Sequence, residues 1–170
     1  MADRLHGDSA LVQLSERLTN SAAFGNLFRE GMDLVEETAA YLDGIGRTEA
    51  KALDRAVSLT YATESMRLTT RLMQLASWLL LHRAVKEGEM TLSQANREKT
   101  KVKLSAADPG AADALAKLPP QLQDLIARSM RLQSKVRRLD TTIHSPSTER
   151  APIGNPLVPQ LNRLKAAFER

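Results

Sequence analysis

The chain has 170 residues and a formal net charge of +4, and it contains no cysteine. This length fits one compact domain with some additional sequence, and the lack of cysteine excludes disulfides, thiol nucleophiles, iron–sulfur clusters and cysteine-based zinc sites. Aromatic residues are few, and Ala, Leu, Arg, Glu and Lys are abundant, which favours helix over strand and predicts an all-α fold.

The N-terminal segment, residues 1–19, carries a short amphipathic stretch around Leu14 that predicts a short helix. Residues 1–8 lack the apolar core of a signal peptide, so we expect the protein to remain in the cytoplasm. The longest uncharged apolar run, residues 72–81, is shorter than the roughly 18 to 20 residues that cross a bilayer, so we expect no membrane partner.

From residue 20 the pattern becomes strictly helical, with one face marked every three or four residues. That face consists of Phe24, Phe28, Gly31, Val35, Thr38 and Leu42. We predict a first helix that ends at Gly44 and Gly46. A second, unusually long helix should begin after Thr48, which is a good N-cap, and continue to Gly88.

The second helix carries two apolar stripes. A stripe that repeats every seven residues consists of Leu59, Met66, Met73 and Leu80. A second stripe beside it consists of Leu68, Leu72, Leu75 and Leu79. Two stripes offer more apolar surface than two neighbouring helices would cover, so we predict a homodimer.

A capping box at Thr91 and Gln94 predicts a polar helix after the second long helix. Pro119 and Pro120 then mark the start of a third long helix. One face of this helix is marked by residues that recur every three or four positions. They are Leu122, Leu125, Ser129, Leu132, Val136, Leu139 and Ile143. The three long helices predict an antiparallel three-helix bundle over residues 20–144. We expect Leu75, Leu79, Leu125, Leu132 and Leu139 in one core.

Residues 145–170 are rich in proline, and we predict a flexible tail there. Near its end, apolar residues at helical spacing predict a short amphipathic helix that carries Leu157, Val158, Leu161, Leu164 and Phe168. This helix either folds back on the bundle or docks on a separate protein. We favour docking, because a Pro-rich leash lets such a helix search a volume.

Polar residues of the second helix allow two interpretations. Glu64, Arg67 and Arg71 either pair locally, which is the default, or border a contact surface for a partner. Trp78 and the two methionines of the seven-residue stripe are expected in the core rather than in a peptide-binding groove. The three histidines lie in separate segments, and we expect them to be structural or at the surface.

Catalytic motifs are not found: the sequence has no phosphate loop, dinucleotide fingerprint or nucleophile elbow. We therefore predict no catalytic residue, no cofactor, no metal site and no enzyme activity. The first helix is acidic and the third is basic, which predicts complementary faces within one bundle. A basic stripe on the third helix makes a nucleic-acid-binding protein the alternative; it consists of Arg128, Arg131, Lys135 and Arg138. We do not favour this alternative, because no helix-turn-helix or interleaved aromatic residues accompany the stripe.

Two stretches of the sequence carry a resemblance to a known family. They are FREGMDLVEETAAYLDGIGR at residues 28–47 and TYATESMRLTTRLMQLASWLLLHRAVKEGEM at residues 60–90. Both are similar to the RcdA family, the regulators of CtrA degradation in bacterial cell-cycle control. The third helix and the Pro-rich tail agree with that family in layout.

The resemblance implies a dimeric three-helix bundle that acts as a protease adaptor. Such an adaptor works with the AAA+ protease ClpXP and the response regulator CpdR, and it tethers cell-cycle regulatory proteins such as CtrA for degradation. A tether raises the local substrate concentration and can deepen apparent affinity roughly 100-fold without a new active site. We expect partner contacts in the apolar residues of the tail and at Glu64, Arg67 and Arg71. Within the cytoplasm, concentration of the protein at a cell pole is an alternative to an even distribution.

Overall fold

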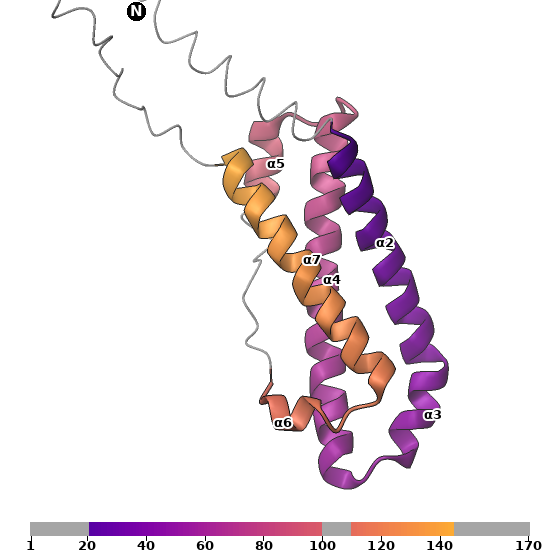
Figure 1. Ribbon diagram of the computed structural model, residues 1–170. Helices are drawn as coiled ribbons and strands as arrows, with labels where there is room; N and C mark the ends of the chain where they lie inside the picture. Colours follow the sequence, from indigo (N-terminus) through magenta and orange to yellow (C-terminus); the bar gives the residue numbers. More distant parts are fainter. Residues whose placement is uncertain (1–20, 100–109, 145–170) are drawn as a thin grey trace, which may run out of the picture.

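The structure is a computed structural model, and it describes residues 21–99 and 110–144. Within these ranges the chain folds into six helices, labelled α2 to α7, and has no strand (Figure 1). The predicted all-α class is confirmed for this part of the chain. The predicted helix within residues 1–19 and the predicted tail, residues 145–170, lie outside the described residues, and so do the five tail residues assigned to partner binding.

Helix α2 (Ala22–Asp43) begins where the Ser21 hydroxyl accepts a hydrogen bond from the backbone N–H of Phe24. This is the ordinary N-cap arrangement, which satisfies one of the free backbone donors of the first turn. The buried positions are Phe24, Leu27, Gly31, Leu34, Thr38 and Tyr41. The other predicted face residues, Phe28, Val35 and Leu42, pack partly buried beside them.

The boundary between the first two predicted helices is different in the structure. Gly46 does not end a helix but lies within a further helix, α3 (Ile45–Ala52). The long helix α4 (Arg55–Lys86) starts only after Asp54, whose carboxylate accepts a hydrogen bond from the backbone N–H of Val57 at 2.9 Å. The predicted start after Thr48 is therefore wrong, because Asp54 provides the N-cap.

Gly46 serves close packing rather than termination. A Cβ atom there would lie 2.6 Å from the carbonyl oxygen of Tyr41 and 2.7 Å from the hydroxyl of Tyr61. Only glycine therefore lets α3 approach the two neighbouring helices this closely. Tyr41 also donates a hydrogen bond to Glu49 of α3 at 2.6 Å, and burial, followed by this bond, raises the pKa of the Tyr41 phenol.

Three further helices complete the described chain. Helix α5 (Leu92–Lys99) begins with the predicted capping box, in which Thr91 and Gln94 exchange hydrogen bonds of 2.9 and 3.2 Å. Helix α6 (Ala112–Leu115) is a single turn. Helix α7 (Pro120–His144) starts at the predicted proline pair and ends the described chain.

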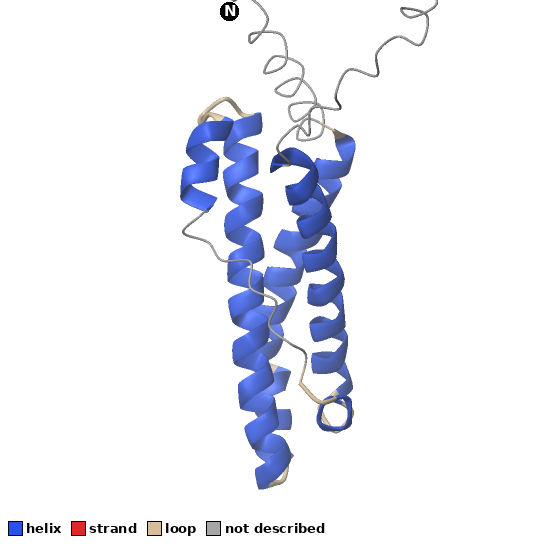
Figure 2. Cartoon of the chain, turned by 90° about the vertical axis from the view of Figure 1, so that its left-hand side faces the viewer, coloured by secondary structure: helices blue, strands red, loops and turns tan. Residues whose placement is uncertain are grey.

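The long helices α2, α4 and α7 pack on one another, but they do not form the antiparallel arrangement that we predicted. Arg71 contacts Ser129 and Trp78 contacts Asp140, so residue numbers rise together along α4 and α7, and these helices run parallel. Helix α2 runs antiparallel to both. The connection through α5 and α6 returns the chain to the end of the bundle where α4 begins before α7 starts (Figure 2).

The core lies between the three long helices. Leu75, Leu79, Leu125 and Leu132 are at most 1% exposed, and Leu139 packs partly buried against the same cluster. The prediction of one shared core is therefore confirmed, with Leu139 at its border. Helix α2 approaches α4 closely at Gly31, where a Cβ atom would collide with the side chain of Leu79.

Candidate interaction surfaces

Four of the five large apolar residues that are exposed in the described chain gather on the outward face of α4; the fifth, Ile45, lies on α3. They are the four members of the seven-residue stripe: Leu59 (71% exposed), Met66 (72%), Met73 (66%) and Leu80 (52%). The prediction that Met66 and Met73 fill the core is therefore wrong, whereas Trp78 is buried as expected. These methionines point outward because α2 and α7 cover only the opposite side of α4, where Leu68, Leu72, Leu75 and Leu79 lie.

The same outward face carries no exposed charge over most of its length. Between Ala56 and Leu80 the sequence has three charged residues, Glu64, Arg67 and Arg71. Two of them are buried inside the bundle, at 4% and 3% exposure for Glu64 and Arg71. A solvated helix face normally carries charged residues, so an uncharged, methionine-bearing face of this length indicates an interaction surface.

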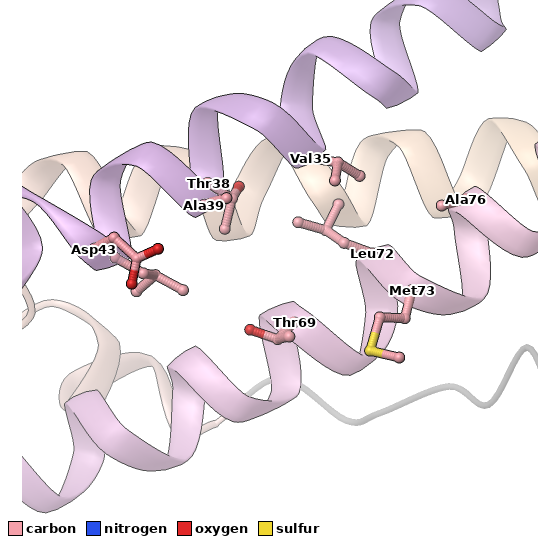
Figure 3. Close-up of a pocket in the computed structure, with 9 residues that line it drawn as sticks. Val35, Thr38, Ala39, Asp43, Thr69, Leu72, Met73 and Ala76 are labelled. Atoms are coloured by element: carbon pink, nitrogen blue, oxygen red, sulfur yellow. The ribbon is translucent and has the colours of Figure 1, made fainter.

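An apolar groove borders this face between α2 and α4 (Figure 3). Its volume is about 290 Å³, and its lining residues are Val35, Thr38, Ala39, Leu42, Asp43, Thr69, Leu72, Met73 and Ala76. The hydroxyl of Thr38 is buried there and has no hydrogen-bond partner in the described part of the chain. Asp43 places one carboxylate at the end of an otherwise mainly apolar lining.

Glu64 and Arg67, two of the residues predicted for partner binding, pair with each other. The Arg67 guanidinium lies 2.7 Å from the Glu64 carboxylate, as the default interpretation of local pairing predicted. Gly110 lies directly over this carboxylate, since a Cβ atom at Gly110 would come within 2.6 Å of it. Of this pair only Arg67, whose side chain is 42% exposed, is accessible to a partner.

Arg71, the third residue of that group, is a structural contact between helices. Its guanidinium donates a hydrogen bond of 2.8 Å to the hydroxyl of Ser129 on α7, which in turn donates to the carbonyl of Ile126. Burial lowers the pKa of Arg71, and the nearby Glu64 carboxylate acts in the opposite direction. Arg71 therefore fixes α4 against α7 and does not face solvent.

A second polar cluster joins α4, α5 and α7 near the end of the bundle. The Trp78 indole donates a hydrogen bond to Asp140 at 2.8 Å, and Lys99 lies 2.6 Å from the same carboxylate. His82 is fully buried and stacks on Trp78, with ring centroids 3.9 Å apart. Burial lowers the pKa of His82. This histidine is therefore structural, as predicted.

Charges on α2 and α7 pair across the bundle. Arg128 lies 2.8 Å from Glu37, and Lys135 lies 2.8 Å from Glu30. These pairs agree with the expected complementary faces. They also occupy two of the four residues of the basic stripe that suggested nucleic-acid binding.

In residues 21–99 and 110–144, no group of three or more His, Asp or Glu side chains is arranged to hold a metal ion. Within the same ranges, no helix is long and apolar enough to span a membrane.

Sequence and structure comparisons place the chain among known proteins. The model of a family described as "Protein of unknown function (DUF1465)" matches residues 15–168. The crystal structure of RcdA from Caulobacter crescentus CB15 is 49% identical to the chain, with a TM-score of 0.65; the match covers 78% of this chain and 99% of that chain. The comparison with curated proteins found no match.

Proposed function

Because the chain belongs to the RcdA family, we propose that it is a non-enzymatic adaptor of regulated proteolysis. In this role it tethers cell-cycle regulatory proteins such as CtrA to the ClpXP protease, together with the response regulator CpdR. It acts in the cytoplasm as a homodimer of three-helix bundles. Each bundle is followed by a Pro-rich tail, residues 145–170, that carries a docking helix.

The observation that carries this proposal is the 49% identity over 99% of the RcdA chain. The physical features of the described chain support it. The polar groups of Arg71 and Trp78 make contacts within the bundle, and the outward face of α4 presents an uncharged apolar surface. Polar contacts that hold the bundle together and an exposed apolar face suit a rigid scaffold that binds proteins. A tether needs only two docking surfaces.

The tail supplies one docking surface in this proposal. Its apolar residues are Leu157, Val158, Leu161, Leu164 and Phe168. An amphipathic helix binds a groove through anchors at such spacing. In α4, Arg67 is the member of the predicted group of three that a partner can reach, because Glu64 and Arg71 are buried.

A degradation assay with purified components tests the proposal. ClpXP, CpdR and CtrA are incubated with ATP, with and without the protein, and the loss of CtrA is followed over time. We expect faster loss of CtrA with the full chain. Replacing Leu161, Leu164 and Phe168 together with Ser should abolish this acceleration and leave the thermal unfolding of the bundle nearly unchanged.

A matched control replaces Gln160 and Asn162, two polar residues of the same segment, with Ala. This control should retain full acceleration. If the unmodified protein fails to accelerate CtrA degradation, the adaptor proposal is wrong. If it instead shifts random DNA, with affinity that falls steeply with salt, the alternative of nucleic-acid binding replaces it.

A further inference from the structure

Two arginines on the outward face of α7 stay outside the ion pairs that join this helix to α2. Of the four residues of the basic stripe, Arg128 and Lys135 pair with glutamates of α2. Arg131 and Arg138 are exposed, and neither forms an ion pair within the part of the chain that the structure describes. They lie seven positions apart, so they share one line along the helix surface at a distance of about 10 Å.

The same face carries no exposed carboxylate to neutralise these arginines. From residue 125 to residue 144 the sequence contains a single acidic residue, Asp140. Its side chain is only 18% exposed and contacts Trp78 of α4 and Lys99 of α5. A solvated helix face usually alternates the two signs of charge. An exposed face with cations alone therefore indicates a partner of opposite charge.

Small uncharged side chains lie next to the two arginines. Ser134 follows Arg131 by three positions and Thr141 follows Arg138 by three positions, so each lies beside an arginine on the helix surface. Both are exposed, and their hydroxyls donate hydrogen bonds of 3.1 and 2.9 Å to carbonyl oxygens of α7 itself. A partner helix can therefore approach this face closely and bring its carboxylates within reach of the guanidinium groups.

An acidic row on α2 decides which class of partner fits. Glu30, Asp33 and Glu37 share one side of α2 at three-four spacing, and the two glutamates pair with α7. A nucleic acid is a continuous polyanion, so it would meet this acidic row as well as the arginines. It would also find two unpaired cations, far fewer than the roughly 6 to 10 phosphate contacts of a strongly salt-dependent DNA-binding protein. A protein helix can instead place single carboxylates at the arginines.

We propose that the outward face of α7 is a docking site for an acidic helix of a partner protein, whose carboxylates seven residues apart meet Arg131 and Arg138. This inference rests on the adaptor function proposed above and gives the adaptor a docking surface besides the tail. Arginine suits this site, because its planar guanidinium can hold a carboxylate through two parallel hydrogen bonds. Since α7 ends at His144, where the tail begins, one partner can contact both surfaces together.

A titration with synthetic peptides tests the spacing. The probe is a fluorescein-labelled helical peptide of Ala and Gln with three glutamates placed seven residues apart. A second peptide of the same composition has them five residues apart, which puts them on different sides of the helix. Fluorescence anisotropy at low salt should show binding of the first peptide at least about tenfold tighter than that of the second. Equal affinities, or no binding of either peptide, would overturn the proposal.

Charge reversal tests the two arginines. Arg131→Glu/Arg138→Glu should weaken binding of the first peptide at least about tenfold and should bind a peptide with Lys in place of each Glu. Arg47→Glu/Lys51→Glu on α3 is the matched control, since it changes two exposed cations in the same way, and it should bind normally. Arg131→Gln/Arg138→Gln adds no negative charge and should show the same loss if charge reversal disturbs folding. Unchanged affinity in a folded variant would overturn the proposal.

Two further measurements separate the site from its alternatives. If random duplex DNA binds more tightly than the first peptide and needs the same arginines, the face is a nucleic-acid site and the proposal is wrong. In the CtrA degradation assay, Arg131→Glu/Arg138→Glu should slow the loss of CtrA, whereas the α3 control should not. Binding of the first peptide by a protein that does not accelerate CtrA degradation would refute the adaptor function and leave the docking site standing.

Discussion

Leu132→Ala tests the core of the bundle most directly. Leu132 is 0% exposed on α7 and lies beside Gly31 of α2, which has no side chain to fill a vacated space. The substitution removes three buried carbon atoms, worth about 2.4 kcal/mol at roughly 0.8 kcal/mol each. A cavity adds to this loss, because the surrounding helices relax only partly. We therefore expect the free energy of unfolding to fall by about 3 to 5 kcal/mol.

Urea unfolding at fixed protein concentration, followed by circular dichroism, measures this loss. Ile45→Ala is the matched control, since Ile45 is 63% exposed and its truncation should change the free energy by less than about 0.5 kcal/mol. Concentration is held constant because the proposed dimerisation would make apparent stability depend on it. A loss under about 0.5 kcal/mol for Leu132→Ala would refute the assignment of this face of α7 to the core.

Three further predictions concern individual contacts. Ser129→Ala removes the hydroxyl that accepts a hydrogen bond from the buried Arg71 guanidinium, and it should lower the free energy of unfolding by about 1 to 3 kcal/mol. Ser134→Ala, on the exposed side of α7, is the control and should lower it by less than about 0.5 kcal/mol. Similar losses for the two variants in urea unfolding would contradict the structural role of the Arg71–Ser129 contact. Burial lowers the pKa of His82, so the folded protein keeps it neutral while the unfolded chain binds a proton below about pH 6.5. The melting temperature should therefore fall as pH decreases from 7 to 5. If a His82→Asn variant shows the same dependence of melting temperature on pH, His82 is not its cause. Thr91→Ala removes the N-cap of α5 and should lower the local stability of this helix by about 1 kcal/mol. Amide hydrogen exchange in α5 should become faster, and an unchanged exchange rate would argue against the capping box.

Much of the fold was predictable from the spacing of apolar residues and from the residues that typically start a helix. The proline pair at the start of α7 and the capping box of α5 lie where the sequence placed them. The direction of α7 was not predictable in this way, because apolar spacing is the same whichever way a helix runs. Direction depends on the connection, and here α5 and α6 bring the chain back before Pro120.

The buried polar residues of α4 could have been recognised from their register. Glu64, Leu68, Arg71 and Leu75 follow one another at four-three-four spacing, so they share one side of the helix. The structure buries that whole side. Residue type suggested a surface position for the two charged members, but register was the stronger signal. The buried Glu64 pairs with Arg67, the local partner that the sequence predicted, and the buried Arg71 contacts Ser129 on α7, which no local pattern reveals.

The two stripes of α4 were visible in the sequence, but their apolar spacing alone did not distinguish their roles. Both are apolar and regular, and only packing decides which one faces α2 and α7. The two stripes do differ in the residues that lie beside each of them on the helix surface. Small uncharged residues such as Ala62, Thr69 and Ala76 accompany the exposed stripe, whereas the buried stripe runs beside Glu64 and Arg71.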